Sequence, residues 1–577
     1  MDDQRTAASA DRARSLTPTY SPIHTLPDEL LSLIFGYTVS QPVFALIPPM
    51  KGWWSIPWVD RHFRRVALQT PRFWATPEFV NEELLESMLS RSGVAPLTVC
   101  FDDRAHRLAE RVAGSDNLAL TLLTKVLLHL PRIENLTIFG SRRTIEHSRH
   151  LLQGRSAALL LCHFSMNCYE SWETLPPAQQ QDQARFITFS DDLLCGQAPR
   201  LRALHIHDLQ LSWTSPLLSS SLVTLILTTP QHSSNAAAIL SALARMPQLN
   251  HLILLNPSPT SDVQVPRPPR APDVVTLSQL RQCLFVADIE DAPALLGTIV
   301  VPQDAKMRMI CGVPDDMEDL TLVVPVAQGL NRWYEHQHPA SSSAQLLAVR
   351  VQAYTTGHWD NLRISTGWDR QPDLLSHNST YEAGDLFVAD MSVDIVIARL
   401  HGTELVLSAS TLLLQSLPIS NVRELVLDYG VHSVTPAWWR TIAKVMPLLD
   451  TVVLHGHNAS DSFFDVLAFS LAPIGVTGQD PEAPPLVQNV RNVSINGVDF
   501  AYPPRCTQAA RALRRMERAQ RKVHKLCLRA CNIPRARVLE LQAHVEMMTL
   551  DDMGRKPDPE GMLTWSSALR DFYLSEL

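Results

Sequence analysis

The feature that most constrains this chain is an apolar frame of the form L-x-x-L-x-L, which recurs along most of its 577 residues. The best-spaced copies begin at residues 201, 222 and 249, so their starts lie 21 and 27 residues apart. The last two apolar positions of each frame alternate with other residues, as in a strand that buries one face. The frames are Ile133-x-x-Leu136-x-Ile138, Leu201-x-x-Leu204-x-Ile206, Leu222-x-x-Leu225-x-Leu227, Leu249-x-x-Leu252-x-Leu254, Leu280-x-x-Cys283-x-Phe285, Val422-x-x-Leu425-x-Leu427, Leu449-x-x-Val452-x-Leu454, Val490-x-x-Val493-x-Ile495 and Val523-x-x-Leu526-x-Leu528.

Several frames follow an amphipathic helical stretch that ends at a proline two residues before the frame. TLLTKVLLHL precedes Pro131, AAAILSALARM precedes Pro247, WWRTIAKVM precedes Pro447, and Pro199 holds the same place before its frame. The residue before a proline is disfavoured in the α region, so the helix is expected to stop there and a strand to follow. One helix–strand unit cannot bury its own apolar face, so neighbouring units must stack.

This pattern resembles irregular leucine-rich repeats that lack the regular Asn or Cys position. The resemblance predicts the α/β class, with a leucine-rich-repeat-like solenoid over residues 90–545 that carries loop insertions. Separate α/β units in an ordinary globular domain would give the same local pattern, and the sequence leaves this alternative open.

Some segments depart from the repeat. Residues 255–273 and 471–488 are rich in proline and are predicted loops. Residues 286–400 match the frame poorly, so they are either degenerate repeats, such as Met317-x-x-Leu320-x-Leu322, or an insertion. We expect a disordered tail over residues 1–21 and a C-terminal tail over residues 546–577.

The composition of the chain indicates the class of protein to which it belongs. The chain is 45% hydrophobic and 19% charged, enough to bury a sizeable core, and its formal net charge of −8 does not favour nucleic acid as a partner. Its nine cysteines are scattered rather than regularly spaced, and neither a signal peptide nor a transmembrane run is visible. These observations predict a cytoplasmic or nuclear protein that does not bind a membrane.

No motif for catalysis or for a cofactor stands out. Phosphate-binding glycine loops, nucleophile elbows and the zinc motif H-E-x-x-H are all missing from the sequence. The pair His205-x-His207 is interpreted as an exposed pair on one strand face rather than as a metal site. We therefore expect no catalytic residue, no metal and no cofactor, and a chain that is not an enzyme.

Residues 22–80 form a separate helical unit. Thr25 and Asp28 fit a capping box, with Pro27 in the first helical turn, and the apolar residues from Leu30 to Phe35 recur at helical spacing. A loop rich in Pro, Gly and Trp follows, and a second helix is predicted from Trp58 to about residue 68. Thr70-Pro71 breaks this helix before a short aromatic turn, Phe73-Trp74.

The helical unit resembles the F-box, and the whole chain resembles fungal F-box proteins with a leucine-rich-repeat-like C-terminal region. The residues that carry the resemblance are Leu26-Pro27-x-Glu29-Leu30-x-x-x-Ile34-Phe35, Val59-x-Arg61-x-Phe63-Arg64-x-Val66-Ala67 and Phe73-Trp74. The sequence departs from the family pattern at Phe63, where the family has Trp, at Asp60, where it has Cys, and in a longer loop between the first two helices.

The resemblance implies a three-helix F-box at residues 22–80 that docks on the small Skp-type adaptor of a cullin ubiquitin ligase. The residues that it assigns to forming or supporting the adaptor surface are Leu26, Pro27, Leu30, Ile34, Phe35, Val59 and Trp74. The repeat domain would then hold an unknown protein substrate close to the conjugating enzyme, which requires no catalytic residue in this chain. The alternative is a repeat-based interaction scaffold without a role in degradation.

In a stack of repeats, the residues that flank the two inner apolar positions of a frame lie on the open face of the sheet. Many of these residues are apolar, so the face either binds something or is covered by part of the chain. The predicted open-face residues are Asn135, Thr137, Phe139, Ala203, His205, His207, Thr224, Ile226, Thr228, His251, Ile253, Leu255, Glu424, Val426, Asp428, Thr451, Val453 and His455.

Overall fold

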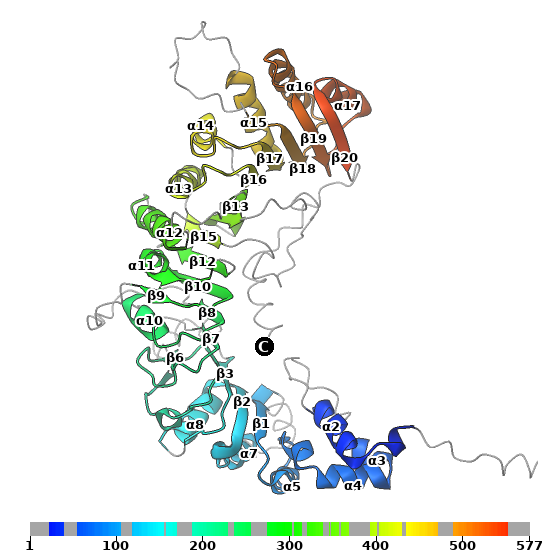
Figure 1. The fold of residues 1–577 in the computed structure, drawn as a ribbon, viewed down its shortest axis with the longest axis vertical. Coiled ribbons are helices and arrows are strands. Elements are labelled where there is room, and N and C mark those ends of the chain that lie inside the picture. Colours follow the sequence, from blue (N-terminus) through cyan, green and yellow to red (C-terminus); the bar gives the residue numbers. More distant parts are fainter. Residues whose placement is uncertain are drawn as a thin grey trace, which may run out of the picture. The chain divides into compact units, whose positions relative to one another are not determined.

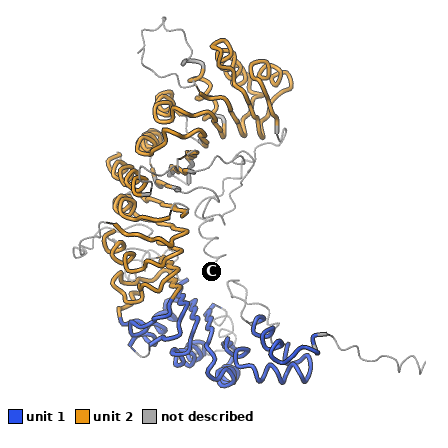
Figure 2. The backbone as a smooth tube through the Cα atoms, viewed as in Figure 1, with its two compact units in different colours: residues 1–170, 192–201, 574–577 blue, residues 171–191, 202–573 orange. Residues whose placement is uncertain are grey.

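The computed structural model of the chain divides into two compact units, coloured separately in Figure 2. Among the described residues, the first unit takes in those up to 169 and residues 192–201, and the second takes in residues 187–191 and 202–551. The structure describes residues 22–39, 55–104, 118–154, 157–169, 187–228, 236–255, 274–302, 305–313, 320–337, 346, 348–356, 359–367, 393–400, 403–429, 434–470 and 489–551. The predicted tail at 1–21 and most of the predicted loops lie outside these residues.

The first unit begins with short helices and continues into a parallel sheet. Strand β2 pairs in parallel with β1 on one side and with β3 on the other. Its elements are η1 (Pro22–Thr25), α2 (Asp28–Val39), α3 (Ile56–Val59), α4 (Arg61–Gln69), η3 (Pro71–Trp74), α5 (Glu82–Ser92), β1 (Leu97–Asp102), α7 (Leu118–Leu127), η4 (Leu130–Arg132), β2 (Ile133–Gly140), α8 (Arg142–Leu152), β3 (His163–Cys168) and η6 (Leu194–Gly196).

The second unit alternates strands and helices along most of its length (Figure 1). Its elements are β4 (Thr188–Phe189), β5 (Ala203–His207), β6 (Gln210–Leu211), β7 (Thr224–Thr228), α10 (Ala236–Leu243), β8 (His251–Leu255), β9 (Val275–Thr276), β10 (Gln282–Asp288), α11 (Ala292–Thr298), β11 (Ile299–Val300), β12 (Lys306–Gly312), α12 (Val323–Gln337), β13 (Ala348–Thr356), β14 (Trp359–Gly367), β15 (Val393–Leu400), α13 (Thr403–Ser416), β16 (Glu424–Tyr429), α14 (Pro436–Val445), β17 (Thr451–His455), α15 (His457–Ser470), β18 (Asn492–Asn496), α16 (Pro503–Arg518), β19 (Val523–Arg529), α17 (Arg535–Gln542) and β20 (Val545–Asp551).

Sixteen of the described strands belong to one mostly parallel sheet, which confirms the expected α/β class. Within the second unit the strand order is β5-β7-β8-β10-β12-β15-β14-β13-β16-β17-β18-β19-β20. Each helix from α10 to α17 contacts the next helix along the chain, and Figure 1 shows α10 to α15 on one side of the strands. The second unit is therefore a sheet with a layer of helices on one face.

Each of the nine frames from Ile133 to Val523 leads into one of these strands, and all of its apolar positions are buried. Leu425 on β16, for example, pairs in register with Val452 on β17, which pairs with Val493 on β18 and through it with Leu526 on β19. All four side chains are at most 2% exposed. The leader helices also form, as α7, α10 and α14, and each ends before its proline.

Residues 286–400 contain parallel strands that continue the repeat and one strand, β14, that runs antiparallel to its neighbours. Strands β13 and β14 form an antiparallel hairpin, and β15 returns antiparallel to β14 and parallel to β12. Leu346-x-x-Val349-x-Val351 on β13 is a further frame, because Val349 and Val351 pair with Leu425 and Leu427. The frame proposed at Met317 is wrong, since Leu322 lies in the turn before helix α12.

Two boundaries differ from the sequence analysis. Strand β20 runs to Asp551, six residues beyond the predicted end of the repeat domain at residue 545, because Met548 and Leu550 continue the alternation and pair with Leu526 and Leu528. Helix α5 was not expected, and its residue Met88 joins the buried core of the N-terminal helices. The helical unit therefore extends to residue 92 rather than ending at residue 80.

Candidate functional site: the N-terminal helices and the open sheet face

The N-terminal helices surround one apolar core. Leu31 and Phe35 on α2 pack with Phe63 and Val66 on α4 and with Phe73 on η3, and all five are at most 5% exposed. The Phe35 ring lies 5.4 Å from the Phe63 ring and 5.9 Å from the Phe73 ring, measured between centroids. The i, i+4 spacing of Leu31 and Phe35 places both on the same side of α2.

Trp74 connects three elements of this unit. Its indole Nε1 donates a hydrogen bond of 2.8 Å to the carbonyl oxygen of Ala67 on α4. Its ring packs edge-on against Phe73 on η3, and the guanidinium of Arg91 on α5 lies 4.5 Å from the ring centroid. Since Trp74 is 4% exposed, it supports the unit from inside and does not form part of its surface.

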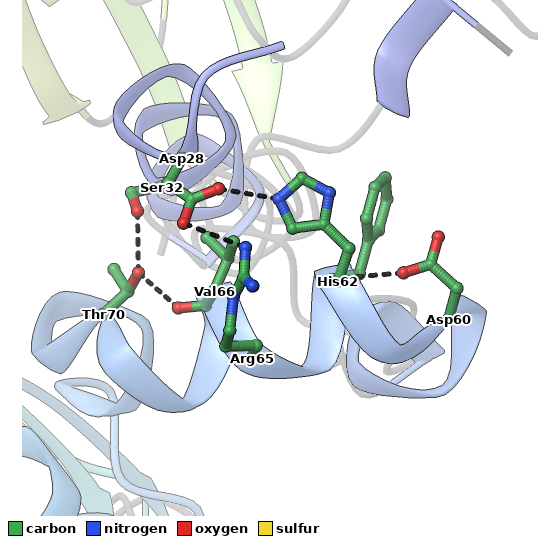
Figure 3. Close-up of polar contacts among 8 residues, drawn as sticks. Asp28, Ser32, Asp60, His62, Arg65, Val66 and Thr70 are labelled. Atoms are coloured by element: carbon green, nitrogen blue, oxygen red, sulfur yellow. Dashed lines mark hydrogen bonds and ion pairs between the residues drawn. The ribbon is translucent and has the colours of Figure 1, made fainter. Parts of the chain in front are cut away.

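A set of polar contacts holds α2 against α4 (Figure 3). The carboxylate of Asp28, in the first turn of α2, lies 2.6 Å from Nε2 of His62 and 3.4 Å from a guanidinium nitrogen of Arg65. One turn further along, the Ser32 and Thr70 hydroxyl oxygens lie 2.8 Å apart. The hydrogen bond with His62 lowers the pKa of Asp28, so the carboxylate is ionised near neutral pH.

The second predicted helix is divided by Asp60. This residue is extended, with φ −160° and ψ −178°, and its carboxylate accepts a hydrogen bond of 2.8 Å from the backbone N–H of Phe63. Asp60 is thus the N-cap of α4, a role for which aspartate is strongly preferred. The helix expected from Trp58 onward is wrong at this point: Trp58 lies on α3, and α4 begins at Arg61.

Helix α2 is apolar on its outer side as well as on its inner side. Leu30 is 45% exposed and Ile34 39% exposed, and Leu33 and Tyr37 are more exposed still. These four residues, at spacings of three and four, form what we call the apolar stripe of α2. A monomeric protein seldom leaves such a stripe on consecutive turns in water.

The residues predicted for adaptor binding fall into two groups rather than one surface. Leu30 and Ile34 lie together on the apolar stripe, whereas Phe35 and Trp74 lie in the core. Of the other three residues, Leu26 is half-buried against the core. Pro27 is exposed directly before α2, and Val59 is exposed on α3.

Sequence reasoning missed Leu33 and Tyr37. Their signal was present, because they follow Leu30 by three and seven residues and so share its side of the helix. The spacing also predicts that Leu30, Leu31, Ile34 and Phe35 share one face of the helix, and this is wrong. Leu31 and Phe35 lie in the core, whereas Leu30 and Ile34 are exposed. Trp58, 76% exposed on α3, was likewise not named.

The open face of the second unit carries a polar row that crosses five adjacent strands. Gln352, Asp428, His455, Asn496 and Arg529 pair in register from β13 through β16, β17 and β18 to β19. The Gln352 amide donates a hydrogen bond of 3.3 Å to the Asp428 carboxylate, and the Asn496 amide lies 3.3 Å from Nε2 of His455. Polar side chains at alternate positions on all five strands place this row away from the apolar faces of the helices.

Charges on this face act on His455. Burial lowers the pKa of the imidazole, the Asp428 carboxylate opposes this effect, and the guanidinium groups of Arg350 and Arg529 lower the pKa further. Arg350 also pairs with Asp428 at 3.6 Å. The row therefore combines mutually bonded polar groups of both charges, which are suited to contacts with a protein segment.

Comparisons with known proteins add no identity. No family model and no curated protein matches this chain. Over the residues that the structure describes, no group of three or more His, Cys, Asp or Glu side chains is placed to hold a metal ion. Within the same residues, no helix has the length and apolar character needed to cross a membrane.

Proposed function

We propose that this protein is the substrate-recognition subunit of a Skp-cullin-F-box ubiquitin ligase. The N-terminal helices would bind the Skp-type adaptor, and the repeat-like domain would bind a protein substrate. The observation that carries the proposal is the apolar stripe of α2, formed by Leu30, Leu33, Ile34 and Tyr37, on a helix whose opposite side is fixed in a core. Most of the motif residues from Leu26 to Trp74 follow the F-box pattern in order, with departures at Asp60 and Phe63 and a longer loop between the first two helices.

The stripe is suited to a hydrophobic groove on a partner. An amphipathic helix binds such a groove through side chains at i, i+3, i+4 and i+7, which is the spacing of Leu30, Leu33, Ile34 and Tyr37. The contacts from Asp28 to His62 and from Ser32 to Thr70 hold α2 on α4 before any partner arrives. A surface that is already ordered loses less conformational entropy on binding.

The second unit supports the proposed leucine-rich-repeat-like solenoid. Its frames pair in register strand by strand, and its helices contact one another in chain order, as expected when each unit stacks on the previous one. The hairpin of β13 and β14 is an interruption within this order. In this proposal the chain catalyses nothing itself and raises the local concentration of a substrate lysine near the conjugating enzyme.

The experiment is to measure complex formation with a Skp-type adaptor by size-exclusion chromatography and calorimetry. The test variant is Leu30→Asp with Ile34→Asp, and the matched control is Val94→Asp with Leu159→Asp, two exposed apolar positions outside α2. Burying each new carboxylate in a groove should cost about 2–3 kcal/mol, so the pair should weaken binding more than about a thousand-fold.

The two outcomes separate the candidate functions. Binding by the wild type and the control, lost in the α2 variant, supports the ligase subunit. A folded wild type that does not bind the adaptor would remove that proposal, and the non-degradative scaffold would replace it.

A further inference from the structure

Helix α16 is apolar on one side and basic on the other. Ala509, Leu513 and Met516 lie on the side that packs into the second unit, and each is at most 1% exposed. Every exposed residue between positions 511 and 518 is an arginine. These arginines recur at spacings of three and four, so they share the outer side of the helix. The arginine stripe of α16, as we call this set, consists of Arg511, Arg514, Arg515 and Arg518.

The neighbouring helices lie on either side of the stripe and do not cover it. The Gln508 side chain donates a hydrogen bond of 3.2 Å to the backbone carbonyl oxygen of Asp461 on α15. In the other direction, the Arg514 guanidinium donates a hydrogen bond of 3.3 Å to Nε2 of His544, the second residue after α17. At about 100° of helix per residue, Arg511 lies about 60° from Gln508 on one side and about 60° from Arg514 on the other. Its exposed side chain therefore projects between the two helices.

Two arginines of the stripe are unpaired within the described part of the chain. Arg511 and Arg518 form no hydrogen bond or ion pair with any residue that the structure describes. The one acidic residue of α16, Glu517, is engaged elsewhere, because its carboxylate oxygens lie 3.3 Å from the Lys522 ammonium and 2.8 Å from Nδ1 of His544. The guanidinium groups of Arg511 and Arg518 can therefore bind an incoming anion.

The stripe concentrates positive charge on a chain that is acidic overall. Residues 503–529 contain nine Lys or Arg residues and one acidic residue, whereas the formal net charge of the whole chain is −8. Like charges four residues apart on a helix repel each other, and the stripe has two such pairs, Arg511 with Arg515 and Arg514 with Arg518. A bound anion would relieve this repulsion, and the local basic field attracts anionic groups to this side of the helix.

The chemistry near the stripe fits a protein segment better than a nucleic acid. Residues 503–551 contain no Phe, Trp or Tyr on which a base could stack. Leu539 on the adjacent helix α17 is 63% exposed and offers a protein segment an apolar contact as well. Arginines four positions apart lie about 6 Å from each other along the helix axis, close to the roughly 6.6 Å between alternate residues of an extended chain. Carboxylates at alternate positions of such a segment can thus meet successive arginines.

We propose that the arginine stripe of α16 binds an acidic segment of a partner protein, an extended segment with carboxylates at alternate positions. Each guanidinium can bind one carboxylate through two parallel hydrogen bonds, and such charge-assisted pairs are stronger than neutral ones. The stripe belongs to the helix layer of the second unit, so it is a site separate from the open sheet face and from the apolar stripe of α2. This inference does not rest on the proposed ligase function.

The test measures binding of the full chain to a fluorescein-labelled peptide of six Glu-Ser repeats by fluorescence anisotropy, in about 50 mM salt so that charges are only partly screened. The test variant is Arg511→Glu with Arg518→Glu. The control is Arg281→Glu with Arg440→Glu, two exposed arginines of the second unit outside α16, so both variants have the same net charge. The test variant should bind about tenfold or more weakly, whereas the control should differ from the wild type by about twofold or less.

The test variant converts two like-charge pairs at i, i+4 into opposite-charge pairs, so its melting temperature should not fall. A second variant, Arg511→Gln with Arg518→Gln, removes the charges without reversing them and should weaken binding about fivefold. The proposal is overturned if the wild type does not bind the peptide, if the test variant and the control bind alike, or if a peptide of six Gln-Ser repeats binds as tightly. Tighter binding of a dT dodecamer that the test variant loses would overturn it in favour of a nucleic acid.

Discussion

Replacing Asp103 by alanine should loosen helix α8, because this buried carboxylate holds the start of the helix. Asp103 follows strand β1 and is 3% exposed. Its Oδ2 accepts a hydrogen bond of 2.8 Å from the backbone N–H of Ser141, the N-cap of α8, and one of 2.6 Å from the hydroxyl of Thr144. The variant leaves both donors buried without this acceptor.

The size of the effect follows from these two bonds. A hydrogen bond to a charged group contributes about 1.5–3 kcal/mol, so losing two should cost about 3 kcal/mol or more. In hydrogen exchange by mass spectrometry, this predicts about 150-fold faster exchange in residues 142–152. The control is Asp102→Ala, which removes only a half-exposed pair with Arg104 and should change exchange by about fivefold or less.

The stabilisation that Asp103 provides should depend on pH, and its pKa gives the direction of this dependence. Burial raises the pKa of Asp103, but hydrogen bonds from Thr144, Tyr169 and Ser141 outweigh burial and lower the pKa below its usual value. A carboxyl whose folded pKa is lowered contributes stability above its unfolded pKa, about 3.9, and loses it as the pH falls through the folded pKa. The difference between wild type and Asp103→Ala should thus be constant from about pH 7 to 5 and shrink below about pH 4. Exchange in α8 that is equal in wild type and variant at pH 7 would refute this reasoning.

Three further predictions concern packing and charge. Gly329→Ala on α12 should lower the stability of the second unit by about 1–3 kcal/mol, measured by urea unfolding. Although alanine favours a helix more than glycine does, its Cβ would lie 2.9 Å from the backbone of Pro293. Trp74→Phe removes the hydrogen bond to Ala67 and should cost about 1–2 kcal/mol in the same assay; an unchanged midpoint would contradict the supporting role of the indole. The hydrogen bond with His62 lowers the pKa of Asp28, so the ionised carboxylate stabilises the fold, and this stabilisation is lost as the pH falls through that pKa. In Asp28→Asn the melting temperature should therefore fall less between about pH 5 and 3 than in the wild type.

The local periodicity of the sequence predicted most of the strands and their core. The frame at Leu425 and Leu427, for example, needed only the alternation of apolar residues and the turn before it to place strand β16. The proline at position 447 likewise predicted where the preceding helix ends. Such features depend on interactions between residues close in the chain, so they are visible without the fold.

The sequence was less informative where the partner residue is distant. Asp28 fits a local capping box, but its carboxylate bonds to His62 and Arg65, 34 and 37 residues away. The frame at Leu346 follows the local pattern and was overlooked in the sequence, but only the structure shows that β13 pairs with β16, with β14 and β15 between them in the chain. The identity of the distant partner leaves no local pattern in either case.

The sequence by itself determined that the chain is α/β, that frames lead into strands, and that Leu30, Leu31, Ile34 and Phe35 are apolar positions of one helix. Only the tertiary structure decided that Leu31 and Phe35 point inward while Leu30 and Ile34 stay exposed, and that Val453 is buried. The physical reason is that periodicity gives the side of an element on which a residue lies, whereas burial depends on which other element packs against that side.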